Sequence, residues 1–288
     1  MKLLPEQPPS ALAYFATLVA EDAGFALLEA AICVAQDEHP GLDTQGVVAE
    51  IDRLAARLRA RLPADAGALQ RLRALNTYFF GELGFAGNVN HYHDPRNSYL
   101  HAVLATRRGI PITLALLYIE LATQLGLTAR GISFPGHFLV KLKLPQGEVV
   151  VDPFDGRSLS REELDERLVP FRARHGLEGD FEAPLGLFLQ AAPPRDILAR
   201  LLRNLKEIHA SAEDWPRLLA VQQRLVLLLP DRPEERRDRG LTWAELGRCA
   251  EAAEDLAAYL AARPQADDAD ALRERLAELR RGGGPRLH

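Results

Sequence analysis

His137 and Asp152 are the two residues of this sequence whose types and spacing could do chemistry. The run from His137 to Leu144 alternates between apolar and polar side chains, as a half-buried strand does. Residues 145–147, Pro-Gln-Gly, supply a turn, and residues 148–151 return as a β-branched strand that ends at Asp152. Because a hairpin folded near its middle brings its two ends together, we predict that His137 and Asp152 are neighbours in space.

Such a pair has two interpretations. A carboxylate that accepts a hydrogen bond from one imidazole nitrogen fixes the tautomer, and the other nitrogen then faces a nucleophile or a substrate. In the alternative, His137 is a residue at a strand start that bonds a carboxylate for structural reasons only. The spacing alone favours the structural interpretation.

A buried helix must position this hairpin. Residues 109–111, Gly-Ile-Pro, form a helix entry, because Pro suits the first turn, where its missing N–H would be unpaired anyway. The segment 113–124 is apolar around most of its circumference, which predicts a helix buried on several sides, and Gly126 ends it. After the hairpin, residues 160–163 start a short helix with a capping box. We predict that four earlier helices pack around the hairpin, at about residues 10–19, 25–36, 44–62 and 66–80.

The segment 81–96 is polar and irregular. Its Asn, His and Asp side chains could suggest a metal site, because two His residues one position apart on a strand put both rings on one face. A metal site needs at least three good ligands in convergent geometry, and the spacing does not supply them, so we predict no metal. We predict instead an ordered loop that borders a cleft near His137. Residues 97 and 98, Asn-Ser, are expected to cap a helix over 99–106.

The C-terminal part is helical throughout and carries a repeat signal. Pro230 and Pro264 lie 34 residues apart, the period of a tetratricopeptide unit. A last amphipathic helix over 267–279 fits a capping repeat. Such a short array either binds a peptide in its groove or only buttresses the fold, and the sequence leaves both open. Small and packing residues occur at the offsets that such a unit needs, namely Gly240, Trp243, Gly247, Ala252 and Leu256.

These elements predict an α+β fold in two domains. Residues 1–192 are expected to form a domain of helices plus a small antiparallel sheet, and residues 193–282 an all-α repeat region. We place the boundary near Ala192, because the segment 170–194 looks irregular and is interrupted by prolines. Residues 283–288 are expected to be a disordered tail.

Composition excludes several functional classes. The 288 residues are 47% hydrophobic, enough for a substantial core. A net charge of −5, from 40 acidic and 35 basic residues mixed along the chain, gives no basic field for nucleic acid. Two cysteines do not make a disulfide framework and fit a reducing compartment. The N-terminus lacks the continuous apolar core of a signal peptide, and no apolar run is long enough for a bilayer. We therefore expect a cytoplasmic protein with no nucleic-acid or membrane partner.

Three stretches of the sequence resemble a known family: GNVNHYHDPRNSYLHAVLATRRGIPITLALLY, FPGHFLVKL and VDPFDG. They are similar to the SirB/YchA family of bacterial proteins, whose transglutaminase-like domain is followed by tetratricopeptide repeats. The resemblance covers about residues 20–280. In the transglutaminase-like superfamily, a Cys at a helix start, a His at a strand start and an Asp on the next strand form a papain-type triad. The resemblance therefore implies a papain-like domain in which His137 and Asp152 match two of the triad positions.

The third triad position departs from the pattern. When His137 and Asp152 are aligned with the His and Asp of the triad, the Cys position falls on Pro111, whose side chain has no nucleophile. Thr113 offers a hydroxyl at the same helix start. It points in a different direction, however, and a hydroxyl is a weaker nucleophile than a thiolate. The two cysteines of the chain fall in other predicted helices, so neither is expected to substitute.

We therefore expect a transglutaminase-like pseudoenzyme that acts as a regulatory or interaction module without a cofactor. It would bind an unidentified protein or peptide through its cleft or its repeats. The alternative is a cryptic hydrolase or acyl transferase in which His137 and Asp152 act with Thr113, Ser98 or a bound water. A pure scaffold is a third hypothesis, but it would have little use for the polar segments 87–99 and 134–137. The candidate binding residues are Asn88, Asn90, His93, Asn97, Ser98, Tyr99, Pro111, Phe134 and Gly136.

Overall fold

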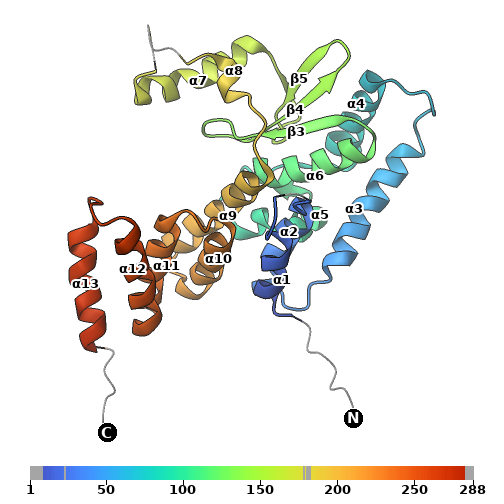
Figure 1. The fold of residues 1–288 in the computed structure, drawn as a ribbon. Coiled ribbons are helices and arrows are strands. Elements are labelled where there is room, and N and C mark those ends of the chain that lie inside the picture. The colour runs from blue at the N-terminus through green and yellow to red at the C-terminus, as the bar shows by residue number, and fades with distance from the viewer. Residues whose placement is uncertain (1–8, 23, 178, 180–182, 283–288) are drawn as a thin grey trace, which may run out of the picture. The chain divides into compact units, whose positions relative to one another are not determined.

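The computed structural model describes residues 9–22, 24–177, 179 and 183–282, which divide into two units (Figure 1). The mixed unit consists of Leu27–Ala35 and Gly41–Leu201. The helical unit consists of the described residues before Leu27, the segment Gln36–Pro40 and the described residues from Leu202 onward. Helices dominate both units, and the mixed unit also carries a small antiparallel sheet. The predicted α+β fold is therefore confirmed.

The sheet is built around the predicted hairpin. Val140 pairs with Val151. This register brings the residues that precede Val140 close to those that follow Val151. The two outer strands were not predicted, because one is only two residues long and the other contains Gly and Arg, which are weak strand signals. The four antiparallel strands follow one another in sequence order as β3 (Thr128–Ile132), β4 (Leu139–Leu144), β5 (Gly147–Val151) and β6 (Ser158–Leu159).

Helix α6 (Pro111–Gln124) packs against β3 and β4 and confirms the predicted buried helix (Figure 1). Pro111 occupies its first position, as expected for a residue without an N–H. Buried side chains point to all its sides, among them those of Leu114, Leu117 and Leu121. Gly126, with φ of +77°, ends the helix in a left-handed conformation that favours glycine.

The four predicted earlier helices are present. Ser10 and Asp43 cap the first and third of them by accepting hydrogen bonds from backbone N–H groups three residues ahead. The prediction that all four pack around the hairpin is wrong. The third and fourth contact α6, which already covers the sheet, and the second contacts the third. The first contacts α10 (Trp215–Leu228) of the helical unit. The four helices are α1 (Ala11–Leu18), α2 (Leu27–Cys33), α3 (Thr44–Arg59) and α4 (Ala68–Asn76).

A π-helical turn over Thr77–Glu82 continues α4, and the predicted irregular segment follows it, but the structure shows short elements here that the sequence did not indicate. Strand β1 (Ala86–Gly87) pairs in parallel with β2 (Arg108–Gly109). A 3₁₀ turn over Pro95–Ser98 precedes α5 (Leu100–Thr106). The prediction that Asn97 and Ser98 cap this helix is wrong, because both lie inside the 3₁₀ turn and no side chain caps α5.

Helix α7 (Arg161–His175) begins with the predicted capping box, in which Ser160 and Glu163 bond each other's backbone N–H. The prediction of irregular structure from residue 170 is wrong, because the helix continues through the exposed Pro170 to His175. Buried Leu164 and Leu168 anchor the helix, so tertiary packing outweighs the unfavourable proline. The short helix α8 (Leu185–Phe188) packs next to it.

The helical unit has the packing expected of tetratricopeptide repeats. Helix α11 (Pro233–Glu245) packs against α12 (Cys249–Ala262), which packs in turn against α13 (Ala269–Gly282). Gly240 lets the first pair approach closely, because a Cβ added there would lie 3.1 Å from side-chain atoms of Asp255 and Leu256. Four of the five predicted small and packing residues therefore lie between packed helices, namely Gly240, Trp243, Ala252 and Leu256. Gly247 instead lies in the turn between α11 and α12, with a φ of +71°.

Helix α9 (Pro194–Ser211) joins the two units, because its residues up to Leu201 belong to the mixed unit and the later ones to the helical unit. The boundary expected near Ala192 stays a prediction, and the predicted tail 283–288 lies outside the described residues. In the ranges that the structure describes, no helix combines the length and the apolar character needed to cross a bilayer.

Candidate functional site

The hairpin brings His137 and Asp152 together, which confirms the predicted contact. His137 lies two residues before β4, and Asp152 follows β5 directly. The Nε2 atom of His137 lies 2.8 Å from Oδ1 of Asp152. Because an ionised carboxylate only accepts hydrogen bonds, Nε2 carries the shared proton, and in the neutral ring Nδ1 keeps its lone pair.

The carboxylate of Asp152 is held by further donors. Its Oδ1 also accepts a hydrogen bond from the backbone N–H of Phe154 at 3.0 Å, and its Oδ2 accepts one from Nη1 of Arg167 at 3.0 Å. Burial alone would raise the pKa of Asp152, but the hydrogen bonds from His137, Phe154 and Arg167 outweigh it and hold the pKa below its usual range. Asp152 is therefore a fixed, charged acceptor that orients the imidazole ring.

His137 is only partly covered by its neighbours. Its side chain is 24% exposed, and within the described part of the chain Nδ1 has no hydrogen-bond partner. The ring centroid of Phe154 lies 6.3 Å from that of His137, and the ring of Tyr92 lies 6.2 Å from that of Phe154. An acceptor nitrogen is thus presented beside an aromatic surface.

The irregular segment before α5 is fixed by two buried or half-buried amides. Asn88 donates from Nδ2 to Oδ1 of Asn97 at 2.9 Å. Asn97 donates from its own Nδ2 to the backbone oxygens of His91 and Tyr92, at 2.6 and 3.1 Å. These bonds satisfy the amide groups locally and hold Tyr92 in place beside Phe154. The geometry assigns Asn88 and Asn97 to the shape of the loop.

The start of α6 carries Pro111 and Thr113, the two residues that the sequence resemblance placed at or beside the Cys position. Pro111 is buried, and Thr113 is fully buried. The Thr113 hydroxyl lies 2.8 Å from the backbone oxygen of Asn97 and 3.0 Å from that of Ile110, and it accepts a hydrogen bond from the N–H of Ile110 at 3.2 Å. The hydroxyl is therefore hydrogen-bonded to backbone groups around the helix start.

The remaining candidate residues fall into two groups. Asn90, His93 and Gly136 are exposed. Gly136 lies in the turn before His137 and has a φ of +69°. Ser98, Tyr99 and Phe134 are buried. Phe134 belongs to the core beneath the sheet. Among the residues described, no group of three or more His, Cys, Asp or Glu side chains is arranged to hold a metal ion.

Several residues of the site were missed by the sequence analysis. Arg167 comes from α7, and its contact with Asp152 depends on how that helix docks. Arg200, on α9, donates from Nη1 to Oγ of Ser133 at 2.7 Å and to the backbone oxygen of Phe134 at 3.2 Å. It therefore supports the turn that leads to His137. No sequence signal marked Arg200, whereas Phe154 lies inside the VDPFDG stretch and could have been found there.

Comparisons with known proteins agree with this architecture. The profile of the transglutaminase-like superfamily matches residues 45–203, and a tetratricopeptide repeat profile matches residues 205–277. A UPF0162 protein of Xylella fastidiosa (strain Temecula1) is 39% identical over 260 residues, which are 90% of this chain and 92% of the relative. UPF0162 protein PA3419 of Pseudomonas aeruginosa is 34% identical over 71% of this chain and 73% of its own length.

More distant relatives carry the names that the sequence resemblance suggested. Protein SirB1 of Salmonella typhimurium and UPF0162 protein YchA of Escherichia coli K12 are each 27% identical over 70% of this chain and 74% of their own length. No solved structure matches the chain significantly. The chain belongs to the transglutaminase-like superfamily and, within it, to the UPF0162 group that includes YchA and SirB1.

Proposed function

We propose that this protein is a non-catalytic member of the transglutaminase-like superfamily that binds a protein partner and regulates it by binding alone. The observation that carries the proposal is the start of α6. By the sequence resemblance, Pro111 matches the position of the superfamily's Cys, and its side chain offers no nucleophile. The neighbouring Thr113 hydroxyl is fully buried, and its hydrogen bonds hold the helix start. An activated nucleophile needs the opposite, namely a hydroxyl or thiol that is accessible to the substrate and close to a base.

The region around His137 suits a protein ligand. Nδ1 of His137 can accept a hydrogen bond from an N–H group of a partner. Tyr92, whose ring lies next to that of Phe154, is 44% exposed, and Val89 on the same loop is 75% exposed, so large apolar side chains of this loop face the solvent. Aromatic and apolar side chains around a few oriented polar groups are typical of the centre of a protein interface.

The repeats offer a second binding surface. Tetratricopeptide arrays generally bind peptide segments of other proteins, and α11 to α13 pack as such repeats do. We propose that the partner contacts the region around His137 or the repeats, and that this takes place in the cytoplasm. The free state of both described cysteines, Cys33 and Cys249, supports a reducing compartment.

A second candidate function is favoured by the His137–Asp152 pair itself. The 2.8 Å contact from Nε2 to a charged carboxylate leaves Nδ1 as a base that a water molecule could approach. The protein would then be a hydrolase or an acyl transferase in which His137 activates a water or an acceptor hydroxyl. The two functions predict different effects of the same substitutions.

The binding function is tested by placing a photo-crosslinking amino acid at Val89 in the full chain, in cells, and identifying the cross-linked protein. With the identified protein purified, His137→Ala and Tyr92→Ala should each weaken binding by about tenfold, as expected for residues at the centre of an interface. Leu187→Ala is the matched control, because Leu187 is 62% exposed on α8 and should leave affinity unchanged. Equal affinities for all four proteins would contradict this binding surface.

The catalytic alternative is tested on the same variants with glutamine-containing peptides and with a chromogenic ester. For a non-catalytic protein, the rates of the wild type, His137→Ala and Asp152→Asn should be the same. A saturable rate that falls by about a hundredfold or more in both variants, as expected on losing a general base, would favour the enzyme.

A further inference from the structure

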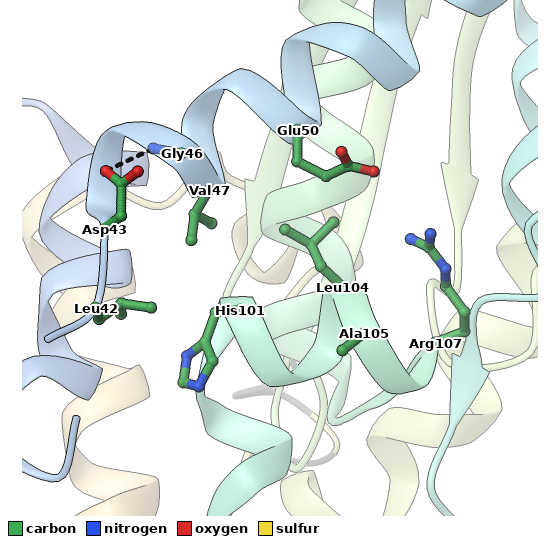
Figure 2. A pocket seen from close by; sticks show the side chains of 9 residues that line it. All are labelled: Leu42, Asp43, Gly46, Val47, Glu50, His101, Leu104, Ala105 and Arg107. Carbon is green, nitrogen blue, oxygen red and sulfur yellow. Dashed lines mark hydrogen bonds between the residues drawn. The ribbon is translucent and has the colours of Figure 1, made fainter.

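A pocket lies between α3 and α5 in the mixed unit, on elements that do not carry His137 or Asp152 (Figure 2). Its volume is about 460 Å³, within the range of sites that hold small molecules. The superfamily resemblance does not account for it. It is lined by Leu42, Asp43, Gly46, Val47, Glu50, His101, Leu104, Ala105 and Arg107.

The middle of the pocket is apolar. Val47 comes from α3, and Leu104 and Ala105 come from α5, so the two helices each supply one wall (Figure 2). Gly46 leaves the α3 wall without a side chain at one turn of the helix. Such a surface favours a hydrocarbon group over water.

The two ends of the pocket differ in charge, and Figure 2 shows Asp43 and Arg107 at opposite ends. The Asp43 carboxylate caps α3 by accepting a hydrogen bond from the N–H of Gly46 at 2.9 Å. A second anion would be repelled there. At the other end, Arg107 lines the pocket with its guanidinium 4.7 Å from the ring centroid of Phe85. A ligand with one anionic end is therefore expected to bind with that end toward Arg107 and away from Asp43.

Arg107 lacks a carboxylate partner among the residues that the structure describes. Its Nη1 atom is buried, and within the same residues no acceptor bonds it. Glu50 is the carboxylate nearest in the pocket wall, but it is bonded by Arg53. The hydrogen bond from Arg53 lowers the pKa of Glu50, and the charges of Arg57 and Arg107 act in the same direction. Glu50 is thus shared with other guanidinium groups and does not serve as a dedicated partner of Arg107.

We propose that this pocket binds a small apolar ligand that carries one carboxylate, with its hydrocarbon part between Val47 and Leu104 and its carboxylate on Arg107. A guanidinium that is partly desolvated gains most from an anionic, bidentate acceptor. The α3 wall from Asp43 to Glu50 is about 10 Å long at 1.5 Å per residue, so a saturated chain of about eight carbons fills it. A straight-chain carboxylate such as octanoate is the simplest probe.

The test is isothermal titration calorimetry of the full chain with octanoate, 1-octanol and acetate. Octanoate should bind saturably with one molecule per chain, whereas octanol, without the anion, and acetate, without the tail, should bind at least about tenfold more weakly. Arg107→Gln should weaken octanoate binding by about tenfold or more, and Arg107→Lys should restore part of it. Ala105→Trp should abolish binding, because the indole fills the pocket.

Two variants serve as matched controls. Arg108→Gln removes the neighbouring guanidinium, which does not line the pocket, and Ala56→Trp places an indole on the exposed face of α3. Both should bind octanoate as the wild type does. The proposal is overturned if octanoate binding does not saturate, if octanol binds as tightly, or if Ala105→Trp leaves binding unchanged. The last two outcomes do not depend on the folding of the Arg107 variants.

Discussion

At the scale of single residues, Asp152 decides the geometry of the site. Its carboxylate orients His137 through Nε2 and receives the N–H of Phe154 and the guanidinium of Arg167. Each of these donors would lose its acceptor, in whole or in part, if the carboxylate were neutralised. A charged group that is buried and fully bonded stabilises the fold only while it stays charged.

This gives a prediction for the pH dependence of stability. The folded-state pKa of Asp152 is lowered, so its contribution is fully present above the unfolded-state pKa of about 3.9 and is lost as the pH falls through the folded-state value. Asp152→Asn should lower the free energy of unfolding at pH 7 by about 1–3 kcal/mol. The difference from wild type should shrink below about pH 4.

Urea unfolding of both proteins between pH 3 and pH 7 measures this difference. Asp155→Asn is the control, because Asp155 is exposed and only three residues away. A difference between wild type and Asp152→Asn that stays constant in acid would show that the charge of Asp152 is not what stabilises the site.

The sequence could predict the His137–Asp152 contact because a short hairpin fixes the distance between its ends. It could not predict Arg167 or Arg200, because both come from helices that follow the hairpin. Which face of such a helix meets the site depends on packing, not on local pattern. Pro111 was located at the start of the buried helix because proline has a strong positional preference there.

At the scale of elements, the two-residue strand β1 contacts both α6 and the segment that follows Asp152. The N–H of Gly87 donates to the backbone oxygen of Phe154 at 2.8 Å. A Cβ added at Gly87 would lie 2.2 Å from ring atoms of Phe154, which real structures do not tolerate. This close approach explains the glycine, since its φ does not require one.

Gly87→Ala should therefore lower the free energy of unfolding by about 1–3 kcal/mol, because Phe154 or the strand must move. The displaced Phe154 ring should also change the NMR chemical shifts of His137, whose ring lies 6.3 Å away. Gly81→Ala is the control, since a Cβ there has nothing within 4 Å. Unchanged stability and unchanged His137 shifts would mean that the contact is readily relieved.

Elements of two residues explain most of what the sequence did not show in the mixed unit. Strands β1, β2 and β6 are too short to carry an alternating pattern. The longer helices and the β4–β5 hairpin were predicted, because their apolar residues repeat over at least one full period. Helix α7 was predicted too short because Pro170 is a strong local signal, and buried Leu164 and Leu168 overrule it.

At the scale of the whole molecule, the two units are interleaved along the sequence. Helix α1 is part of the helical unit, where Phe15 is fully buried and its ring lies 5.3 Å from the guanidinium of Arg224 on α10. The first residues of α9 are part of the mixed unit, where Ile197 packs close to Gly131 and Arg200 bonds Ser133. A cut at a single point in the chain therefore leaves both units incomplete.

A fragment that ends at Ala192 should consequently be less stable than one spanning Leu27–Leu201, although both contain His137 and Asp152. The 1–192 fragment keeps α1 without α10, which exposes Phe15, and it loses the buried Ile197, worth about 1.5–3 kcal/mol. The 27–201 fragment keeps Ile197 and Arg200 and omits α1. Circular dichroism melts should give a lower midpoint for 1–192, and this fragment should bind more of the dye anilinonaphthalene sulfonate, which reports exposed apolar surface. If 1–192 instead melts at the same temperature or higher, the start of α9 is dispensable and the boundary near Ala192 stands as a true domain limit.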